Sequence, residues 1–262
     1  MKQTKSTLLL EHHLKQLKLP TMLREYAPVA ATSTRERLDY PGYLLCLAER
    51  ELLEREQRAA QRRIKAARFP VIKTLETFDF RAQPSINGQL VRELMAGEYI
   101  DRRENILIVG NSGTGKTHLA SALGFAACTQ GCKVRFFTVT GLVTLLLEMR
   151  EERRLERTLA QLQRQHLLIL DELGYVPFSK TSAELLFDIV SRAYEQQSLI
   201  VTTNLPFENW TEVMGSERLT GALLDRLTHR VHIIEANGES YRLKESRKRL
   251  KARASRGNKT TS

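Results

Sequence analysis

The stretch ENILIVGNSGTGKTHLASAL, residues 104–123, decides the fold of this chain. Its apolar beginning predicts a strand, and the residues after the glycines predict a helix. Between them Gly110, Gly115, Lys116 and Thr117 fit the pattern G-x-x-x-x-G-K-[ST]. Because this motif requires a strand before it and a helix after it, a glycine-rich turn that matches by chance is the poorer explanation.

The chemistry of the motif is phosphate binding. Glycines let the backbone curl, so that successive N–H groups and the start of the helix point at one anion. Lys116 is expected to reach the β- and γ-phosphates of ATP, and the Thr117 hydroxyl to hold Mg²⁺. The candidate nucleotide-binding residues in this stretch are Gly110, Asn111, Ser112, Gly113, Thr114, Gly115, Lys116, Thr117 and His118.

Composition narrows the class of protein. The 262 residues suffice for one large domain with a small appendage. A formal net charge of +11 favours a polyanionic partner such as nucleic acid, although charge also serves solubility. The three cysteines form no C-x-x-C pair, which fits reduced thiols in a cytoplasmic protein. No run approaches the ~18 apolar residues of a membrane span, and the apolar run near the N-terminus is too short for a signal peptide.

The first 70 residues are expected to form a small helical domain. Leu10, Leu14 and Leu17 repeat at helical spacing, and Ser33 with Glu36 fits a capping box at the start of a helix. A longer helix is predicted over 43–68. Its later half carries only basic charges after Glu56. Two interpretations of these residues stand equally, a solvated helix face and a contact with the DNA backbone. The candidate DNA-binding residues here are Arg55, Arg58, Arg62, Arg63, Lys65 and Arg68.

Residues 71–241 are expected to form the catalytic domain. Short apolar strands alternate there with helices, a pattern typical of a parallel α/β sheet. The predicted strands are 105–110, 133–139, 166–172, 198–204 and 230–235. The last stretch, residues 242–262, is a basic tail that is expected to be disordered without a partner.

Acidic and amide side chains follow two of these strands. Asp171 and Glu172 end an apolar strand, at the edge where α/β sheets bind ligands. Asp171 is expected to support Mg²⁺ beside the nucleotide, and Glu172 to polarise the attacking water as a general base. Asn204 follows the next strand and is placed to orient that water, the alternative being a turn asparagine before Pro206. Together with the phosphate loop, these residues predict ATP hydrolysis.

An arginine is the remaining element. Arginine from a neighbouring subunit stabilises the charge of the transition state in related hydrolases. In SERLTGALLDRLTHRVHIIE, residues 216–235, Arg226 is the first candidate, with Arg218 and Arg230 behind it. The sequence does not decide which of them faces a neighbour, and any of them can instead form a surface salt bridge.

The phosphate loop, LLILDELG (167–174), VTTNLPFENW (201–210) and LLDRLTHRVHIIEANGESYR (223–242) together resemble the AAA+ ATPases of the DnaA/DnaC initiator and helicase-loader clade. TLETFDF (74–80) and the arginine-rich N-terminal helices most resemble the IstB-type transposition helper ATPases of bacterial insertion sequences. The resemblance implies an AAA+ core with a five-stranded parallel sheet behind an all-α N-terminal domain. It also implies ATP-dependent self-assembly, binding of duplex DNA and a transposase partner.

Three details depend on this resemblance. Phe78 or Phe80 is expected near the adenine, unless both belong to the core. The clade carries extra helices between the second and third strands, and EMREERRLERTLAQLQRQ (148–165) occupies that place with Arg153 and Arg154 as candidate DNA contacts, a solvated helix being the alternative. Too few residues follow the last strand for a C-terminal lid domain. Arg242 is then the candidate to substitute for the arginine that such a lid provides.

Three functions follow from these features. The first is an ATP-dependent DNA-binding oligomer that helps a transposase select or prepare its target. The second is a helicase loader of the DnaC type, which predicts a preference for single strands. The third is a small-molecule kinase, which Asp171, Glu172 and Asn204 disfavour because they point to water as the phosphate acceptor.

Overall fold

The computed structural model describes residues 5–241 and 243 of the chain. The chain divides into two compact units, Met1–Arg62 and Arg63–Ser262. The division falls inside the long helix α3 (Tyr40–Ala67), earlier than the boundary expected at residue 70. Arg242 and the rest of the basic tail, apart from Leu243, lie outside the described residues.

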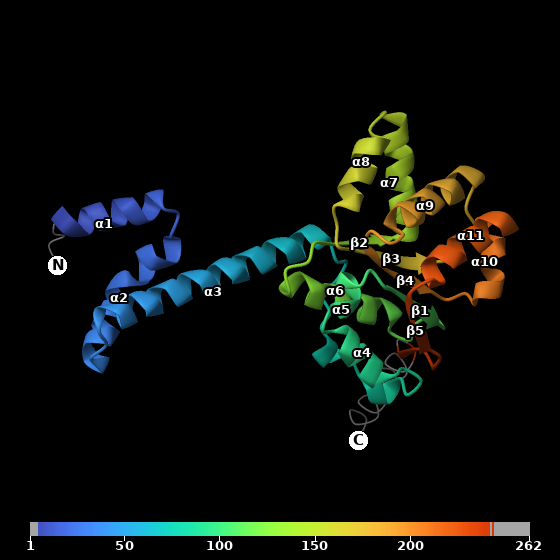
Figure 1. Ribbon diagram of the computed structural model, residues 1–262. Coiled ribbons are helices and arrows are strands. Elements are labelled where there is room, and N and C mark those ends of the chain that lie inside the picture. Colours follow the sequence, from blue (N-terminus) through green and yellow to red (C-terminus); the bar gives the residue numbers. More distant parts are fainter. Residues whose placement is uncertain (1–4, 242, 244–262) are drawn as a thin grey trace, which may run out of the picture. The chain divides into compact units, whose positions relative to one another are not determined.

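The N-terminal unit consists of α1 (Lys5–Gln16), α2 (Pro20–Glu36) and the first part of α3 (Figure 1). The start of α2 leaves backbone N–H groups without partners inside the helix. Glu51 of α3 supplies them, because its carboxylate accepts hydrogen bonds from the N–H groups of Thr21 and Met22 at 2.8 and 3.0 Å. This buried carboxylate therefore fixes α2 against α3.

The capping box expected at Ser33 and Glu36 is wrong. Both residues lie inside the last turns of α2, and Ser33 is buried. The next helix begins later, where the Asp39 carboxylate accepts a hydrogen bond from the N–H of Gly42 at 2.8 Å. Asp39 performs the capping function because its side chain satisfies one of the free N–H groups of the first turn of α3.

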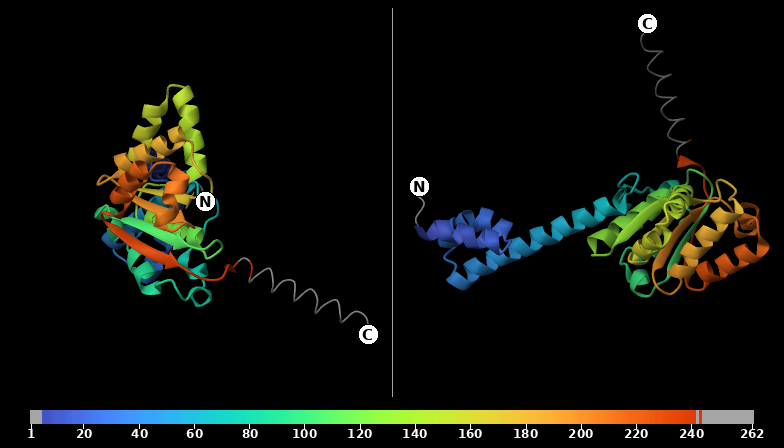
Figure 2. Two further views of the ribbon diagram at one scale, coloured as in Figure 1. Left: turned by 90° about the vertical axis from the view of Figure 1, so that its right-hand side faces the viewer. Right: turned by 90° about the horizontal axis from the view of Figure 1, so that it is seen from above.

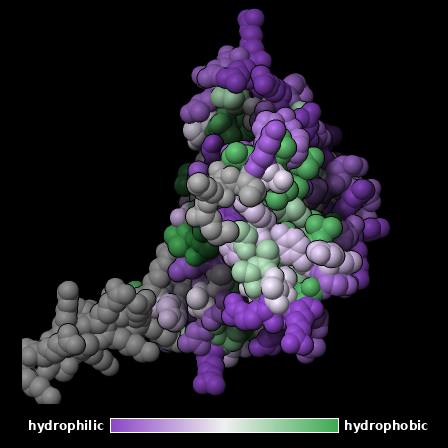
Figure 3. Space-filling model, turned by 90° about the vertical axis from the view of Figure 1, so that its left-hand side faces the viewer, coloured by the Kyte–Doolittle hydropathy of each residue, from purple (hydrophilic) through white to green (hydrophobic). Residues whose placement is uncertain are grey.

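The N-terminal unit buries few apolar side chains and exposes many. Among its described residues, Leu14, Val29 and Leu47 are buried. Figure 3 shows hydrophobic side chains among hydrophilic ones on one face of the molecule. The exposed large apolar residues of the unit, here called the N-terminal apolar surface, are Leu8, Leu9, Leu10, Leu17, Leu38, Tyr40, Leu44, Leu45, Leu52 and Leu53, which are between 42% and 92% exposed.

The second unit is built on a five-stranded parallel sheet, which confirms the expected fold class. Its strands lie in the order β2-β3-β4-β1-β5. Their bounds are β1 Asn105–Gly110, β2 Val134–Thr138, β3 Leu167–Leu173, β4 Ser198–Thr203 and β5 Val231–Ala236. Each lies within one residue of the predicted range at either end.

Helices cover both faces of the sheet (Figure 1, Figure 2). In β3, Leu168 and Leu170 belong to one core cluster, whereas Leu167 and Ile169 belong to the other. Both faces of the strand are thus buried, which is why its sequence is a continuous apolar run rather than an alternating one. The first cluster includes α7 (Val139–Glu151), α8 (Leu155–Gln163), α9 (Lys180–Ala193), α10 (Trp210–Met214) and α11 (Glu217–Thr228); the second includes α4 (Gly88–Leu94), α5 (Glu98–Asp101) and α6 (Lys116–Thr129).

The connections determine where a ligand can bind. Two short 3₁₀ helices, Leu75–Thr77 and Phe80–Ala82, lead into the sheet, and a third, Phe207–Asn209, follows β4. The carboxyl ends of the parallel strands share one edge, where the loops leave the sheet. After β5 the described residues form no lid domain. Within the described part of the chain, no helix is both long enough and apolar enough to cross a membrane.

Candidate nucleotide site

A cavity of about 680 Å³ opens at the carboxyl edge of the sheet. The phosphate loop forms one side of it, and the segment from Pro70 to Gln83 contributes another. The cavity brings together most of the residues predicted to bind and hydrolyse ATP. Those that line it are Ser112, Gly113, Thr114, Gly115, Lys116, Thr117, His118, Asp171 and Glu172.

Lys116 lies across the phosphate loop. Its side chain is buried, and Nζ donates hydrogen bonds to the carbonyl oxygens of Gly110 and Asn111, each at 2.7 Å. The carbonyl groups of Gly110 and Asn111 thus orient the Lys116 side chain, although neither residue lines the cavity. The ammonium group is therefore already positioned inside the loop that would surround the phosphates.

Gly115 permits a close approach to the segment that precedes the sheet. Its φ is +96°, and a Cβ atom there would lie 2.7 Å from Cε2 of Phe78. Phe78 also lines the cavity, whereas Phe80 packs against Phe78 and does not line it. Of the two aromatic residues expected near the adenine, Phe78 is therefore the one that the nucleotide cavity exposes.

His118 connects the phosphate-loop helix to the same segment. Its Nε2–H donates to the Thr74 carbonyl at 3.0 Å, and its ring meets that of Phe78 edge to face, with centroids 5.1 Å apart. Burial lowers the pKa of His118, and the charge of Lys73 acts in the same direction, while the bond to Thr74 opposes them. The His118 ring thus packs on Phe78 beside the phosphate loop.

Asp171 lies buried between two hydroxyl groups. Thr117 Oγ1 donates to its carboxylate, 3.0 Å from each oxygen, and Thr202 Oγ1 donates to Oδ1. Burial raises the pKa of Asp171, and this outweighs the hydrogen bonds from Thr202 and Thr117 and the charge of Lys116, which lower it. A buried carboxylate beside the Thr117 hydroxyl presents oxygen atoms of the kind that Mg²⁺ prefers.

Glu172 is held in an unusual backbone conformation. Its φ is +64°, in the left-handed region, and the pairing of β3 with β4 shifts register between Leu170 and Leu173. Thr202 Oγ1 accepts a hydrogen bond from the Glu172 N–H at 3.0 Å and so stabilises the bulge. Bulges beside active sites re-aim a side chain. Here the Glu172 side chain is exposed and lines the cavity, while Asp171 stays buried.

Asn204 follows β4, beside the strand that carries the acidic pair. Its side-chain Oδ1 is buried and has no hydrogen-bond partner in the described structure. It is not among the residues that line the cavity. Within the described residues this oxygen is therefore an unsatisfied hydrogen-bond acceptor beside the catalytic edge.

The candidate arginines lie apart from the nucleotide cavity of their own chain. Arg218 and Arg226, both on α11, line a different cavity of about 610 Å³. The Arg226 guanidinium lies 4.8 Å from the centroid of the Phe187 ring and donates to the Ala222 carbonyl at 2.7 Å. Arg230 is exposed directly before β5. None of the three lines the cavity that holds Lys116 and Glu172.

The basic residues of the long helix differ in their surroundings. In the N-terminal unit, Arg55 donates to the Lys18 carbonyl and Arg58 to the Thr21 hydroxyl, so both support the packing of that unit. In the second unit, Arg63 donates to the Cys128 carbonyl at 2.8 Å. The candidate DNA contacts that are exposed are Arg55, Arg62, Lys65, Arg68, Arg153 and Arg154, the last of which forms an ion pair with Glu152.

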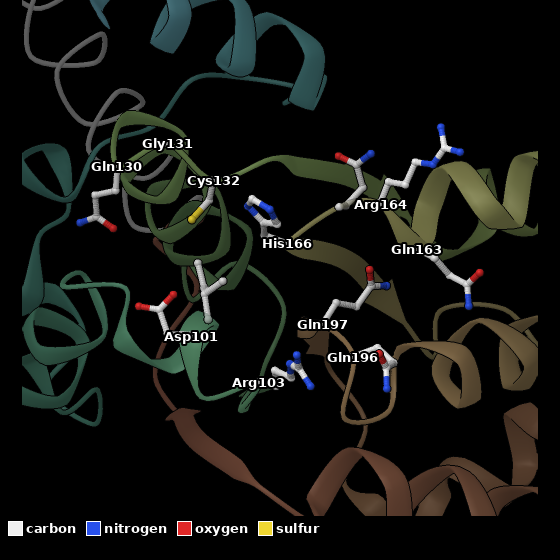
Figure 4. Close-up of a pocket in the computed structure, with 12 residues that line it drawn as sticks. Asp101, Arg103, Gln130, Gly131, Cys132, Gln163, Arg164, His166, Gln196 and Gln197 are labelled. Carbon is white, nitrogen blue, oxygen red and sulfur yellow. The ribbon is translucent and has the colours of Figure 1, made fainter.

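A further cavity of about 460 Å³ lies near the starts of β3 and β4. Figure 4 shows the side chains around it, among them Arg103, His166 and Gln197. Two of its glutamines satisfy helix carbonyls, since Gln130 Nε2 donates to Met95 and Gln165 Nε2 to Gln161. These side chains act as caps, and none of the predicted site residues lies here.

Several contributors to the nucleotide site were not foreseen from the sequence, among them Thr202, Gln83 and Tyr241. Thr202 hydrogen-bonds both acidic residues, and Gln83 and Tyr241 line the cavity. The polar pair that precedes Asn204 in the apolar run SLIVTTN was the available signal for Thr202. Gln83 and Tyr241 come from opposite ends of the unit, and no sequence pattern connects them.

A phosphate loop, a buried aspartate beside its threonine and an exposed glutamate directed into the cavity define a P-loop ATPase. The family model of the IstB-like ATP binding protein matches residues 12–249, and the chain belongs to that family. It is an ATP-binding ATPase of the AAA+ type.

Relatives with known names cover nearly the whole chain. It is 41% identical over 239 residues to the insertion sequence IS21 putative ATP-binding protein of Pseudomonas aeruginosa, covering 91% of this chain and 90% of the relative. It is 40% identical over 232 residues to the insertion sequence IS5376 putative ATP-binding protein of Geobacillus stearothermophilus, covering 88% and 92%.

Solved structures show the same fold at low identity. The replication initiator DnaA bound to AMPPCP and single-stranded DNA matches with a TM-score of 0.54 and 22% identity, over 71% of this chain and 56% of that one. DnaI matches with a TM-score of 0.52 and 16% identity, over 62% and 90%. These likenesses support the AAA+ fold alone.

Proposed function

We propose that this ATPase assembles as a homo-oligomer on duplex DNA in the cytoplasm and helps a cognate transposase select or prepare target DNA. The observation that carries the proposal is the similarity over about nine-tenths of the chain to ATP-binding proteins of insertion sequences. Insertion sequences imply a transposase as the protein partner. The basic residues of this chain favour DNA as the molecule on which it assembles.

The nucleotide in this proposal is ATP with Mg²⁺. The N–H groups of Gly113 and Gly115 and the Lys116 ammonium bind the phosphates. Thr117 and Asp171 fit Mg²⁺, because their oxygen atoms already lie 3.0 Å apart. Mg²⁺ takes one or two protein oxygens together with phosphates and water. When bound, it neutralises charge that develops on the phosphates.

Hydrolysis depends on Glu172 and Asn204. Water attacks the γ-phosphate, the bond to the β-phosphate breaks, and Glu172 accepts the proton of the water. The left-handed conformation of Glu172 supports this role, because strained residues persist where the surrounding structure imposes them, often at active sites. The unpaired Oδ1 of Asn204 supports a second contact to the same water.

An arginine from a neighbouring subunit completes the site. Arg226 is the proposed residue, because its own nucleotide cavity does not include it and an aromatic ring holds its guanidinium at a separate cavity. In such systems the trans arginine raises the rate by about 10³–10⁵. Hydrolysis would therefore require assembly.

The basic surface supplies the DNA contacts. We assign them first to the exposed Arg62, Lys65 and Arg68. Arg58 and Arg63 are partly buried, and Arg55 donates to the Lys18 carbonyl outside its own helix, whereas the bond from Arg62 is to the Arg58 carbonyl one turn before it. Arg153 and Arg154, at the turn between α7 and α8, are a second group. Contacts of this kind read the phosphate backbone, so binding falls with salt and depends little on base sequence.

Self-association is assigned to the N-terminal residues 1–70, with residues 71–241 as the ATPase domain and the basic tail 242–262 adding charge. The N-terminal apolar surface supports this assignment. Its exposed leucines exceed the three apolar side chains that the described part of the unit buries. Exposed apolar residues mark protein interfaces where they are contiguous, and we propose that those of α1 and α3 meet a second copy.

The experiment is sedimentation velocity of the wild type and of Lys116→Ala, with duplex or single-stranded DNA and with ATP, ADP or no nucleotide. We expect large particles only with duplex and ATP, and none with Lys116→Ala. Arg24→Ala is a matched control for loss of one positive charge. Arg24 forms ion pairs with Glu25 and Glu54 and is not among the proposed DNA contacts.

Two outcomes would contradict the proposal. Assembly on single strands alone would favour a helicase loader of the DnaC type. A monomer on duplex in ATP would remove both the oligomer and the DNA-binding role, while leaving the ATPase assignment to be tested by hydrolysis. Addition of the cognate transposase then tests the partnership, since its strand transfer should require ATP and the wild-type helper.

A further inference from the structure

The segment after β5 crosses the phosphate loop. The Tyr241 N–H donates a hydrogen bond to the Gly113 carbonyl at 2.9 Å. Ser240 packs so closely on Gly113 that a Cβ atom there would lie 2.1 Å from the serine Oγ. Because Gly113 also has a φ of +79°, glycine is required both for the loop and for this contact.

The same segment is attached to the other side of the cavity. Gln83 Nε2 donates to the Glu239 carbonyl at 2.9 Å. Gln83 is 2% exposed, lines the nucleotide cavity, and its Oε1 has no hydrogen-bond partner within the described residues. Two contacts, one to the phosphate loop and one to the segment that contains Phe78, therefore hold residues 239–241 over the site.

The position of Tyr241 in the cavity follows from these contacts. Its side chain is 46% exposed and lines the cavity together with Phe78 and Gly113. Lys116 and Asp171 line the cavity beside Thr117 of the phosphate loop, and Pro70, Val71 and Phe78 are apolar residues of the same lining, here called its apolar part. A nucleotide whose phosphates lie in the loop would place its ribose and base beside that apolar part.

We propose that residues 237–241 form a clasp over bound ATP, in which the ring of Tyr241 packs on the nucleoside half of the ligand. The clasp depends on ATP binding and is independent of the proposed role in transposition. By linkage, a nucleotide that tightens the clasp is itself bound more tightly by it.

The first test is calorimetric titration of the full-length chain with AMPPCP. Tyr241→Ala should weaken binding about 5- to 100-fold, the range for loss of a stacked aromatic ring, and Tyr241→Phe should bind like the wild type. Tyr194→Ala is the control, because Tyr194 contacts His229 in the same unit and does not line the nucleotide cavity. Inorganic tripolyphosphate, which lacks a nucleoside, should bind Tyr241→Ala and the wild type equally.

The second test is hydrogen exchange at the Tyr241 amide. AMPPCP should slow this exchange in the wild type and leave it unchanged in Lys116→Ala. Equal losses of AMPPCP and tripolyphosphate binding in Tyr241→Ala would overturn the proposal, since the ring would then act through the phosphate loop. So would faster exchange of the Tyr241 amide with nucleotide, which would mean that the clasp opens. If the wild type bound no AMPPCP, ATP binding itself would fail instead.

Discussion

At Glu172 the backbone strain of a positive φ can be measured separately from the role of the side chain in hydrolysis. Alanine and glycine both remove the carboxylate, but only alanine retains a Cβ atom in the left-handed conformation at φ +64°. We expect Glu172→Gly to be more stable than Glu172→Ala. In both variants the rate of ATP hydrolysis should fall about 10²- to 10⁴-fold, the usual contribution of a general base.

The magnitude follows from two opposing terms. The left-handed conformation costs a non-glycine residue about 1–2 kcal/mol. Glycine forfeits about 0.4–1 kcal/mol through the greater freedom of the unfolded chain. The net difference is about 1 kcal/mol in favour of glycine, which corresponds to about 2–4 °C in the Tm of a unit of this size.

The assay is thermal unfolding of the apo chain, with Glu184 as the matched control. Glu184 is exposed inside α9, where glycine costs about 1 kcal/mol relative to alanine. At position 184 the order of the two variants should therefore reverse. Glu172→Gln, measured beside them, keeps the shape of the side chain and should still lose hydrolysis.

A Glu172→Gly variant less stable than Glu172→Ala would refute the argument, because it would show that residue 172 is not held at positive φ. Retention of hydrolysis by Glu172→Gln would refute a different step. The conformation would then stand, and the assignment of Glu172 as the base would fail.

Three more perturbations have defined outcomes. Asp171→Asn should lose hydrolysis at least about 100-fold. Burial raises the pKa of Asp171 in the folded chain above its ordinary carboxyl value. The free energy of unfolding of the wild-type apo chain should therefore fall as the pH rises from the ordinary carboxyl pKa through the raised one. Thermal melting of Asp171→Asn over the same pH range should lack this fall. Gly115→Ala should lower the Tm more than Gly131→Ala, since both have φ near +100° but only the first meets Phe78, at 2.7 Å, and scanning calorimetry of the two variants checks this. Arg226→Ala and Glu172→Gln should each be inactive alone. If the arginine acts in trans, mixing them at equal concentration should restore ATP hydrolysis at about a quarter of the subunit interfaces, those that join an intact Glu172 to an intact Arg226. A mixture that hydrolyses no ATP would contradict that role.

The strands were predictable because each is an apolar run closed by polar residues. The sheet edge that gathers the phosphate loop, Asp171 and Glu172 was predictable for the same reason, as carboxyl ends of parallel strands meet there. By contrast, the capping box at Ser33 failed because α2 continues through the candidate cap and a later aspartate satisfies the next helix. Local pattern alone does not decide between two such caps.

The contacts that shape the site were not predictable. Thr202 reaches Asp171 and the Glu172 backbone only because β4 lies beside β3 with a shifted register. Gln83 meets Glu239, from the far end of the unit, through the fold alone. The basic helix shows the same limit, since the sequence does not reveal that Arg58 hydrogen-bonds Thr21 while Lys65 stays exposed.

Each part of the proposed mechanism is incomplete within one chain. Within the described residues, the cavity that the exposed Glu172 lines includes no arginine, while Arg226 lines another cavity that includes no residue of the phosphate loop. The N-terminal apolar surface lacks a covering partner within the described part of its unit. In the proposed oligomer neighbouring copies would supply what each part lacks, so the hydrolysis rate per subunit should rise with protein concentration, and DNA that concentrates the subunits should raise it further.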